Sequence, residues 1–447
     1  MTSDGNENAS TKMTPLWEAR QLRKEIEEVI NRTRVIDVHT HLFAPEFGDL
    51  NLYGIDELLT YHYLIAETFR STDISPEKFW QLTKPEQADL VWKTLFVENS
   101  PISEATRGVI TVLTALGLDP NKSDLSEARA FFHSQCITEH LERVFEAAGV
   151  SDVVMTNDPF DVRETHVWER DVEIDRRFHA ALRLDRLLNN WAGTAPRIAH
   201  LGYHVGPELD GNTTAEVRKF LDEWIVRMRP LYLAVSLPDT FKFPAADQRD
   251  KILREVVLPS ALQHKLPLAL MIGVRRGVNP ALRRAGDGVG RADVGSVERL
   301  CAENPEVRLM ATFLSRENQH ELCVAARKFS NLMPFGCWWF LNNPSIVSEI
   351  TRERLELLGT SFIPQHSDAS ILEQLIYKWR HSREIFIDLI CEAYERLLNG
   401  GRAIQRGDIE RDIKRLFSGN FSQWVGPIRN GPTSGNQKKE TAYIFAD

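Results

Sequence analysis

The chain has few cysteines for its length, and they are scattered. Five cysteines occur among 447 residues, and none forms a Cys-x-x-Cys pair. This spacing argues against a zinc knuckle made of thiolates and against a disulfide framework. It fits a reducing compartment, so we expect a cytoplasmic protein.

Long apolar segments and an excess of basic residues are also missing. No apolar run approaches the roughly 20 residues that a membrane-spanning helix needs, and the polar stretch from Met1 to Thr14 lacks the apolar centre of a secretion signal. The formal net charge is −9, so no overall positive field attracts nucleic acid or an anionic membrane. We expect neither as a partner.

Two common catalytic motifs are absent from the sequence. It contains no glycine-rich phosphate loop ending in Lys-Ser/Thr, which argues against a nucleotide-hydrolysing P-loop. It also contains no Gly-x-Ser-x-Gly motif, the strand-to-helix turn that carries the serine of α/β-hydrolases.

What the chain does contain is a repeated alternation of short apolar, β-branched segments with helical stretches. Such alternation indicates a parallel sheet, and eight strands indicate a closed (β/α)8 TIM-type barrel. The predicted strands are residues 35–41, 152–156, 181–184, 231–237, 267–272, 308–314, 332–336 and 360–364.

The region between the first two strands has almost no strand signal. We predict helices at 55–71, 76–97, 104–116 and 125–148, forming a helical insertion over residues 50–148 after strand 1. Insertions of this kind usually lie at the C-terminal face of a barrel, where active sites also lie. Residues 15–49 and 149–425 then form the barrel, a long helix covers 370–398, and residues 1–14 and 426–447 form loose tails.

The first strand ends in two histidines separated by one residue. It reads Val-Ile-Asp-Val-His-Thr-His and ends at His41. Side chains at i and i+2 of a strand point to the same side, so His39 and His41 project together. Neutral imidazoles are good ligands for zinc and similar ions. The structural alternative is two histidines with satisfied hydrogen bonds near a strand end.

A carboxylate follows the last predicted strand, in the sequence Gln-His-Ser-Asp that ends at Asp368. Strand 8 neighbours strand 1 in a closed barrel, so Asp368 could reach the same ion as His39 and His41. Two histidines and a carboxylate form an open metal site. His366 lies in the same segment as a candidate catalytic residue. Alternatively, Asp368 is the N-cap of a helix starting near Ser370.

Other polar and aromatic residues follow further strands. Arg183 lies in the third strand and needs an anionic partner, either the substrate or an acid such as Asp185. Arg275 follows the fifth strand and could bind an anion, although exposed loop arginines are common. Trp338 and Trp339 follow the seventh strand and either form the wall of a sugar pocket or cap the barrel.

The ordered set of these motifs resembles the uronate isomerase (glucuronate isomerase) family, a branch of the amidohydrolase superfamily. The resemblance spans about residues 30 to 395. Its elements are His39 and His41, Tyr61-His62-Tyr63, Thr156-Asn157-Asp158-Pro159, Arg183 with Asp185, Ile272-Gly273-Val274-Arg275, Gly286-Asp287-Gly288-Val289-Gly290, Trp338-Trp339-Phe340, Asp368 and Arg380-His381.

This resemblance implies a metal-assisted aldose–ketose isomerase that acts on a hexuronate, such as glucuronate to fructuronate. It implies one divalent metal, expected to be Zn²⁺, held by His39, His41 and Asp368. Asp368, His366 and Arg380 are the expected catalytic residues. The small acidic sugar is expected to contact His62, Arg183, Arg275, Trp338 and Trp339.

Two positions depart from the family pattern. The family has an arginine two residues after the strand 8 aspartate, where this chain has Ser370, and a histidine at the end of strand 5, where it has Met271. The family's metal-binding residues are therefore more completely present in this chain than its substrate-binding residues. A metal-dependent hydrolase of an amide, ester or lactone, or an inactive relative, therefore stays open, as does assembly into a homo-oligomer.

Overall fold

A curled parallel sheet forms the centre of the molecule. The computed structural model describes residues 19–170 and 172–426, and the predicted tails fall outside these residues apart from Gly426. The strands follow the order β1-β2-β3-β4-β5-β7-β8, and every neighbouring pair on this path is parallel. This order confirms the predicted (β/α)8 topology, in which each strand lies beside the next one along the chain.

The first seven predicted strands are present. Their apolar runs are buried between the barrel interior and the surrounding helices, as the near-continuous hydrophobic pattern of parallel strands requires. The bounds are β1 Val35–Thr40, β2 Val150–Asn157, β3 Phe178–Arg183, β4 Leu233–Pro238, β5 Leu268–Arg275, β7 Leu309–Phe313 and β8 Leu332–Pro334. A further short strand, β6 Gly288–Val289, pairs antiparallel with the end of β5.

The prediction of a regular eighth strand at residues 360–364 was wrong. It pairs with β8 through one parallel bridge between Phe335 and Ile363. Pro364 has no amide hydrogen and cannot continue the ladder. Beyond it, the chain closes the barrel against β1, because Asp368 N donates to His39 O at 3.2 Å and His41 N donates to Ala369 O at 2.7 Å.

Helices cover the outside of the sheet. Most follow a strand and return the chain to the start of the next, and several are extended by short 3₁₀ or π turns. The bounds are α9 Val162–Glu169, α10 Asp185–Asn189, α11 Trp191–His200, α12 Gly211–Met228, α13 Gln248–Ile252, η3 Leu253–Val257, α14 Leu258–His264, η4 Pro280–Gly286, α15 Val294–Glu303, η5 Arg316–Asn318, α16 Gln319–Ala326, η6 Trp339–Leu341 and α17 Pro344–Leu358.

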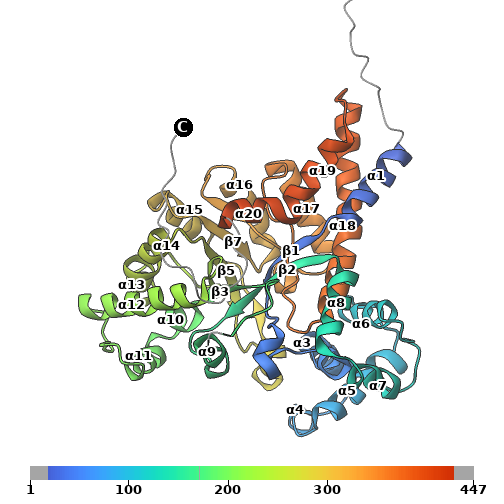
Figure 1. Ribbon diagram of the computed structural model, residues 1–447, viewed down its shortest axis with the longest axis horizontal. Helices are drawn as coiled ribbons and strands as arrows, with labels where there is room; N and C mark the ends of the chain where they lie inside the picture. Colours follow the sequence, from blue (N-terminus) through green and yellow to red (C-terminus); the bar gives the residue numbers. More distant parts are fainter. Residues whose placement is uncertain (1–18, 171, 427–447) are drawn as a thin grey trace, which may run out of the picture.

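Between β1 and β2 the described chain is helical, and Figure 1 shows these helices gathered at one side of the barrel. The predicted helix 55–71 is broken at Tyr61, whose extended backbone (φ −68°, ψ 142°) starts a new helix at His62. The bounds are η1 Pro45–Leu50, α2 Ile55–Leu59, α3 His62–Ser71, α4 Pro76–Phe79, α5 Lys84–Trp92, η2 Lys93–Val97, α6 Glu104–Ala115, α7 Ser126–His133 and α8 Ile137–Ala148. Our division of the chain into domains stays a prediction.

One long helix, α18 Gln374–Asn399, lies between the barrel and the insertion (Figure 1). It packs against α1 Ala19–Arg32, α6, α8 and α17. Leu22, Ile26 and Ile30 of α1 are fully buried, as their spacing of four predicts. The chain continues through α19 Arg406–Lys414, η7 Arg415–Gly419 and α20 Asn420–Val425.

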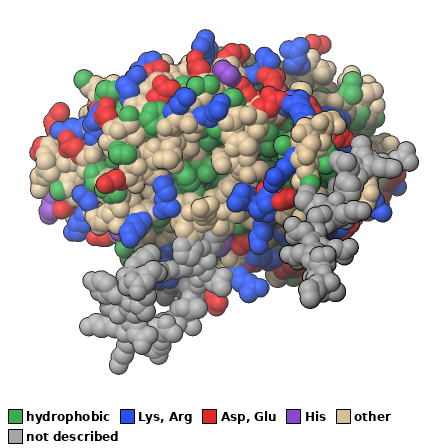
Figure 2. Space-filling model, turned by 90° about the horizontal axis from the view of Figure 1, so that it is seen from above, with side chains coloured by type: hydrophobic (Ala, Val, Ile, Leu, Met, Phe, Trp, Pro, Cys, Tyr) green, Lys and Arg blue, Asp and Glu red, His purple; other side chains and the backbone are tan. Residues whose placement is uncertain are grey.

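The outer surface carries both signs of charge. On the face in Figure 2, lysine and arginine side chains are interspersed with aspartate and glutamate. Within the described residues, no helix is both long and apolar enough to cross a membrane.

Candidate metal centre at the barrel mouth

Three predicted metal ligands converge at the C-terminal end of β1. Nε2 of His39 and Nε2 of His41 each lie 3.5 Å from Oδ1 of Asp368. One ligand atom from each of the three residues lies within 4.8 Å of the ligand atoms of the other two. In residues 19–170 and 172–426, this is the one group of three such side chains brought together in this way. His39 and Asp368 are buried, while His41 is half-buried.

A hydroxyl group behind His39 determines which ring nitrogen carries its proton. Nδ1 of His39 lies 3.3 Å from the Tyr232 hydroxyl, which itself donates to Val38 O at 2.6 Å. Because the Tyr232 hydrogen is already used, its oxygen accepts from Nδ1–H of His39. The Nε2 lone pair is then free to face Asp368.

The same arrangement is repeated at His41. Nδ1 of His41 lies 2.7 Å from Oγ1 of Thr156, and the Thr156 hydroxyl donates to Thr40 O at 3.0 Å. Oγ1 of Thr156 therefore accepts from Nδ1–H of His41. Both histidines present an unprotonated Nε2 to the same carboxylate oxygen.

This arrangement of side chains is suited to binding a cation. Oδ1 of Asp368 is buried and has no hydrogen-bond partner, so two nitrogen lone pairs and a carboxylate oxygen face one another without a proton between them. Burial, with the neighbouring His366, holds the pKa of His39 well below its usual value. Burial opposes ionisation of Asp368, whereas a positive charge on the neighbouring His41 or His39 lowers its pKa. Neutral imidazoles and an ionised carboxylate are the forms that bind divalent metals.

The helix-cap alternative for Asp368 was wrong. Helix α18 starts at Gln374, and Glu373 occupies its N-cap position. Ahead of the helix, Oε1 of Gln374 accepts from the amide nitrogens of Ser370 and Ile371. Asp368 has φ +54°, a left-handed conformation that non-glycine residues adopt rarely and mostly at functional sites.

A buried acid on β1 fixes the segment that carries Asp368. Oδ1 of Asp37 accepts from Ser367 N at 3.0 Å, and Oδ2 accepts from Trp379 Nε1 at 2.8 Å. Burial raises the pKa of Asp37 to about 6, although both hydrogen bonds favour its ionised form. Asp37 thus links β1, the loop before α18 and α18 itself. This role of Asp37 was not predicted from the sequence, although an acid inside an apolar strand is a signal for it.

His366 lies next to the candidate metal ligands. Its ring is fully buried, 5.1 Å from the ring of His39, and neither ring nitrogen has a hydrogen-bond partner among the described residues. Burial lowers its pKa to about 4, so it is neutral at pH 7. The ring fits because Gly336 has no Cβ, which would lie 1.9 Å from His366 Cδ2. A catalytic role for His366 stays a prediction.

His62 and Trp339 form one wall of the mouth. Nε1 of Trp339 donates to Nε2 of His62 at 3.0 Å, joining the insertion to the segment after β8. Trp339 has φ +47° and stacks on Phe340 at 4.7 Å, while Trp338 is almost completely buried. Burial, together with the charge of Arg284, lowers the pKa of His62 to about 3.

The three predicted arginines lie in different environments. Nε of Arg183 lies 3.0 Å from Oδ2 of Asp185, and the positive charge of Arg183 contributes to lowering the pKa of His39. Arg275 is 56% exposed at its side chain and faces Asp239 at 3.8 Å. Arg380 is exposed on α18, where it lines a surface pocket between α6 and α18 and makes no hydrogen bond or ion pair to the three metal ligands. The proposed substrate and catalytic roles of these residues stay predictions.

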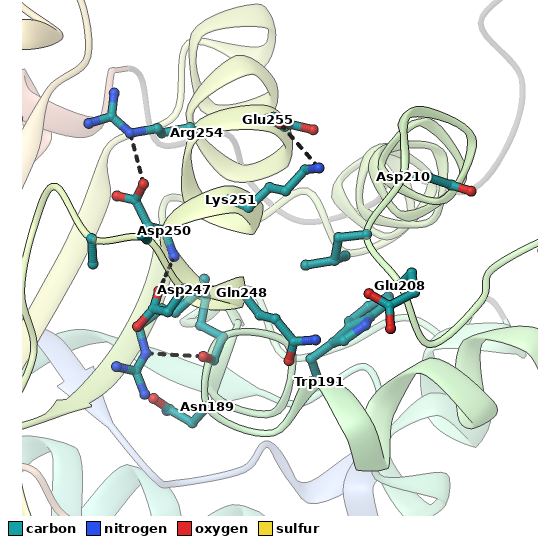
Figure 3. Close-up of a pocket in the computed structure, with 15 residues that line it drawn as sticks. Asn189, Trp191, Glu208, Asp210, Asp247, Gln248, Asp250, Lys251, Arg254 and Glu255 are labelled. Atoms are coloured by element: carbon teal, nitrogen blue, oxygen red, sulfur yellow. Dashed lines mark hydrogen bonds and ion pairs between the residues drawn. The ribbon is translucent and has the colours of Figure 1, made fainter.

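A large open cleft of about 940 Å³ lies elsewhere, between α10, the segment before α12, and α13 (Figure 3). It is rich in acids, with Glu208, Asp210, Asp247, Asp250 and Glu255 in its wall. None of the predicted site residues lines it, so it is separate from the metal centre.

Comparison with known proteins finds close structural relatives. A uronate isomerase from Bacillus halodurans C-125 is 52% identical and superposes with a TM-score of 0.91, over 92% of this chain and 98% of that chain. A uronate isomerase from Thermotoga maritima (13% identity, TM-score 0.75, 91% and 97% covered) and a glucuronate isomerase from Caulobacter crescentus (14%, 0.71, 91% and 94%) share the fold. No family model and no curated protein matches the chain.

Proposed function

The chain belongs to the uronate isomerase family, and from that premise we propose that it interconverts a hexuronate aldose and its ketose, as in glucuronate to fructuronate. The observation that carries the proposal is the cluster of His39, His41 and Asp368 at the barrel mouth of a member of this family. The substrate class follows from the name of the relative from Bacillus halodurans.

We propose that His39, His41 and Asp368 hold one divalent metal, and that the ion is Zn²⁺. Two neutral imidazole nitrogens and one carboxylate oxygen are typical of open zinc sites, which leave positions free for water or substrate. When bound, such an ion polarises sugar oxygens as a Lewis acid. The hydroxyls of Tyr232 and Thr156 keep both rings in the tautomer that this binding requires.

Isomerisation of the open-chain aldose to the ketose moves one proton from C2 to C1 and a second proton from the C2 hydroxyl to the C1 oxygen. We propose that Asp368 takes and returns the carbon-bound proton, directly or through water, because it is held ionised at the mouth. The indole and phenyl rings of Trp339 and Phe340, stacked together, would shield the reacting carbons from water. His62, fixed by its hydrogen bond from Trp339, would contact the sugar hydroxyls.

Turnover of purified, zinc-loaded protein tests this proposal. D-glucuronate and D-galacturonate should each be offered, and the ketose followed by NMR. We expect a ketose from at least one of them, and none from His39→Ala protein. If neither sugar yields a ketose although one zinc is bound per chain, the isomerase proposal fails and the hydrolase alternative returns.

A further inference from the structure

Asn342, directly after η6, holds the backbone of the segment that carries Asp368. Its side chain is buried, and Nδ2 donates to His366 O and to Ser367 O, both at 3.2 Å. An amide group has two N–H hydrogens, so both are used. Oδ1 accepts from Nε2 of Gln365 at 3.1 Å. These partners fix the orientation of the amide, because the reverse orientation would place Oδ1 against two carbonyl oxygens.

The two bonds to carbonyl groups stabilise a bend in the backbone. Consecutive carbonyl groups of an extended strand point in opposite directions, whereas those of His366 and Ser367 share one amide nitrogen. Directly after this bend, Asp368 has φ +54°. The same segment is bonded to β1, since Ser367 N donates to Oδ1 of Asp37 at 3.0 Å. Asp368 is therefore placed by hydrogen bonds from two sides, one from β1 and one from Asn342.

The backbone of Asn342 belongs to the wall of the mouth. Its N–H donates to Trp339 O at 2.9 Å, and its carbonyl oxygen accepts from Nζ of Lys378 on α18 at 3.4 Å. Lys378 is buried and lies 2.7 Å from Oε1 of Glu104 on α6. Asn342 thus connects three parts of the molecule, which are the wall that carries Trp339, the helical region after β1 and the segment of Asp368.

We propose that Asn342 is a positioning residue of the candidate metal centre. It keeps Oδ1 of Asp368 at 3.5 Å from Nε2 of both histidines, and it links this spacing to the wall that carries Trp339. Asn342 acts through two backbone carbonyl groups, so its loss would change the position of the carboxylate although all three candidate ligands remain. This inference rests on the proposed metal site.

The zinc affinity of Asn342→Ala protein tests the inference. The variant leaves two buried carbonyl oxygens without their donor, which is costly, so we expect the segment to shift. Zinc should then bind about 10- to 100-fold more weakly, the usual effect of losing a contact that orients a ligand. Competition with a chelator measures the affinity. Cobalt(II), bound in place of zinc, should have a different visible absorption spectrum in the variant than in wild type.

Asn331→Ala is the matched control. Asn331 is also buried, but it lies directly before β8, at the end of the barrel opposite the mouth. Its Nδ2 donates to the backbone carbonyl groups of Cys301, Asn304 and Val307 at 3.0 to 3.2 Å. We expect this variant to lose stability in urea, as Asn342→Ala does. It should keep the wild-type cobalt spectrum and bind zinc within about 2-fold of wild type, because distant sites act independently.

Two results would overturn the role of Asn342. One is that Asn342→Ala binds zinc as tightly as wild type, and the other is that Asn331→Ala loses as much zinc affinity as Asn342→Ala. Failure of the proposed metal site looks different, because wild type would then bind no zinc, or His39→Ala would bind it equally well. The positioning role would fall with the site in that case.

Discussion

At the scale of single residues, the candidate metal centre depends on two hydroxyl groups that are not among the candidate ligands. Tyr232 and Thr156 each accept from Nδ1–H of a histidine and pass their own hydrogen to a backbone carbonyl. Each histidine is thus held in the tautomer that exposes Nε2. The candidate ligand residues could be predicted from the sequence. Their partners could not, because Thr156 in β2 and Tyr232, directly before β4, lie more than 100 positions away and their contacts depend on side-chain rotamers.

Removal of the hydroxyl behind His41 should weaken metal binding. Thr156→Val is expected to lower zinc affinity about 10- to 100-fold, the usual effect of losing such a supporting contact. Competition with a chelator measures the affinity. Thr111→Val, which removes a hydroxyl bonded to Arg107 O within α6, is the control and should bind zinc like wild type. Equal affinities of all three proteins would contradict the role of Thr156.

A second residue-scale prediction concerns pH. Glu164 is buried behind the end of β2, where its Oε2 accepts from Asn157 Nδ2 and Asp158 N, both at 3.0 Å. Burial raises its pKa from 4.5 to about 8, despite these hydrogen bonds. The folded protein therefore holds this proton more tightly than the unfolded chain. The resulting stabilisation is complete below about pH 4.5 and is lost as the pH rises through about 8.

Glu164→Gln should therefore be less sensitive to pH than wild type. Urea unfolding at pH 6 and pH 8 measures the change in the free energy of unfolding. We expect this change to be smaller in Glu164→Gln than in wild type. Glu169→Gln, on the exposed end of the same helix, should behave like wild type. If both variants keep the wild-type dependence, Glu164 is not protonated in the folded protein.

At the scale of elements, the start of α18 is tied to the insertion by a buried pair. Nε2 of His140 on α8 lies 2.6 Å from Oε1 of Glu373, and both side chains are fully buried. Both oxygens of Glu373 also lie 3.2 Å from Gly54 N, in the turn before α2. This pair connects three segments around the loop that carries Asp368.

Loss of this pair should destabilise the protein strongly. Glu373→Ala leaves the ring of His140 and the amide of Gly54 buried without a partner, so the free energy of unfolding should fall by about 3 kcal/mol. Chemical denaturation measures it. Glu384→Ala, at an exposed position of the same helix, should change it by less than about 0.5 kcal/mol. A Glu373→Ala protein as stable as Glu384→Ala would contradict the account.

The elements also show where sequence patterns stop being sufficient. Strands β1 to β5, β7 and β8 follow their apolar runs. Pro364 interrupts the predicted eighth strand, residues 360–364. The break at Tyr61 divides the predicted helix 55–71, although the spacing of apolar residues continues through the break.

At the scale of the whole molecule, barrel closure creates the site. His39 and Asp368 are 329 positions apart in the sequence. The segment after residues 360–364 pairs with β1 and places Nε2 of His39 3.5 Å from Oδ1 of Asp368. This proximity was predictable, since strands 1 and 8 are neighbours in any closed barrel. The contact of Trp80 in the helical region after β1 with Ala281 in the loop after β5 could not be predicted from this topology.

The central claim is that the His39, His41 and Asp368 cluster holds the metal on which isomerisation depends. It is tested most directly by stripping the protein of metal and measuring the initial rate of ketose formation during stepwise addition of zinc. We expect negligible activity without metal, and a rate that rises to a plateau at one zinc per chain in wild type but not in His39→Ala. A rate independent of zinc, or the same zinc response in His39→Ala, would contradict it.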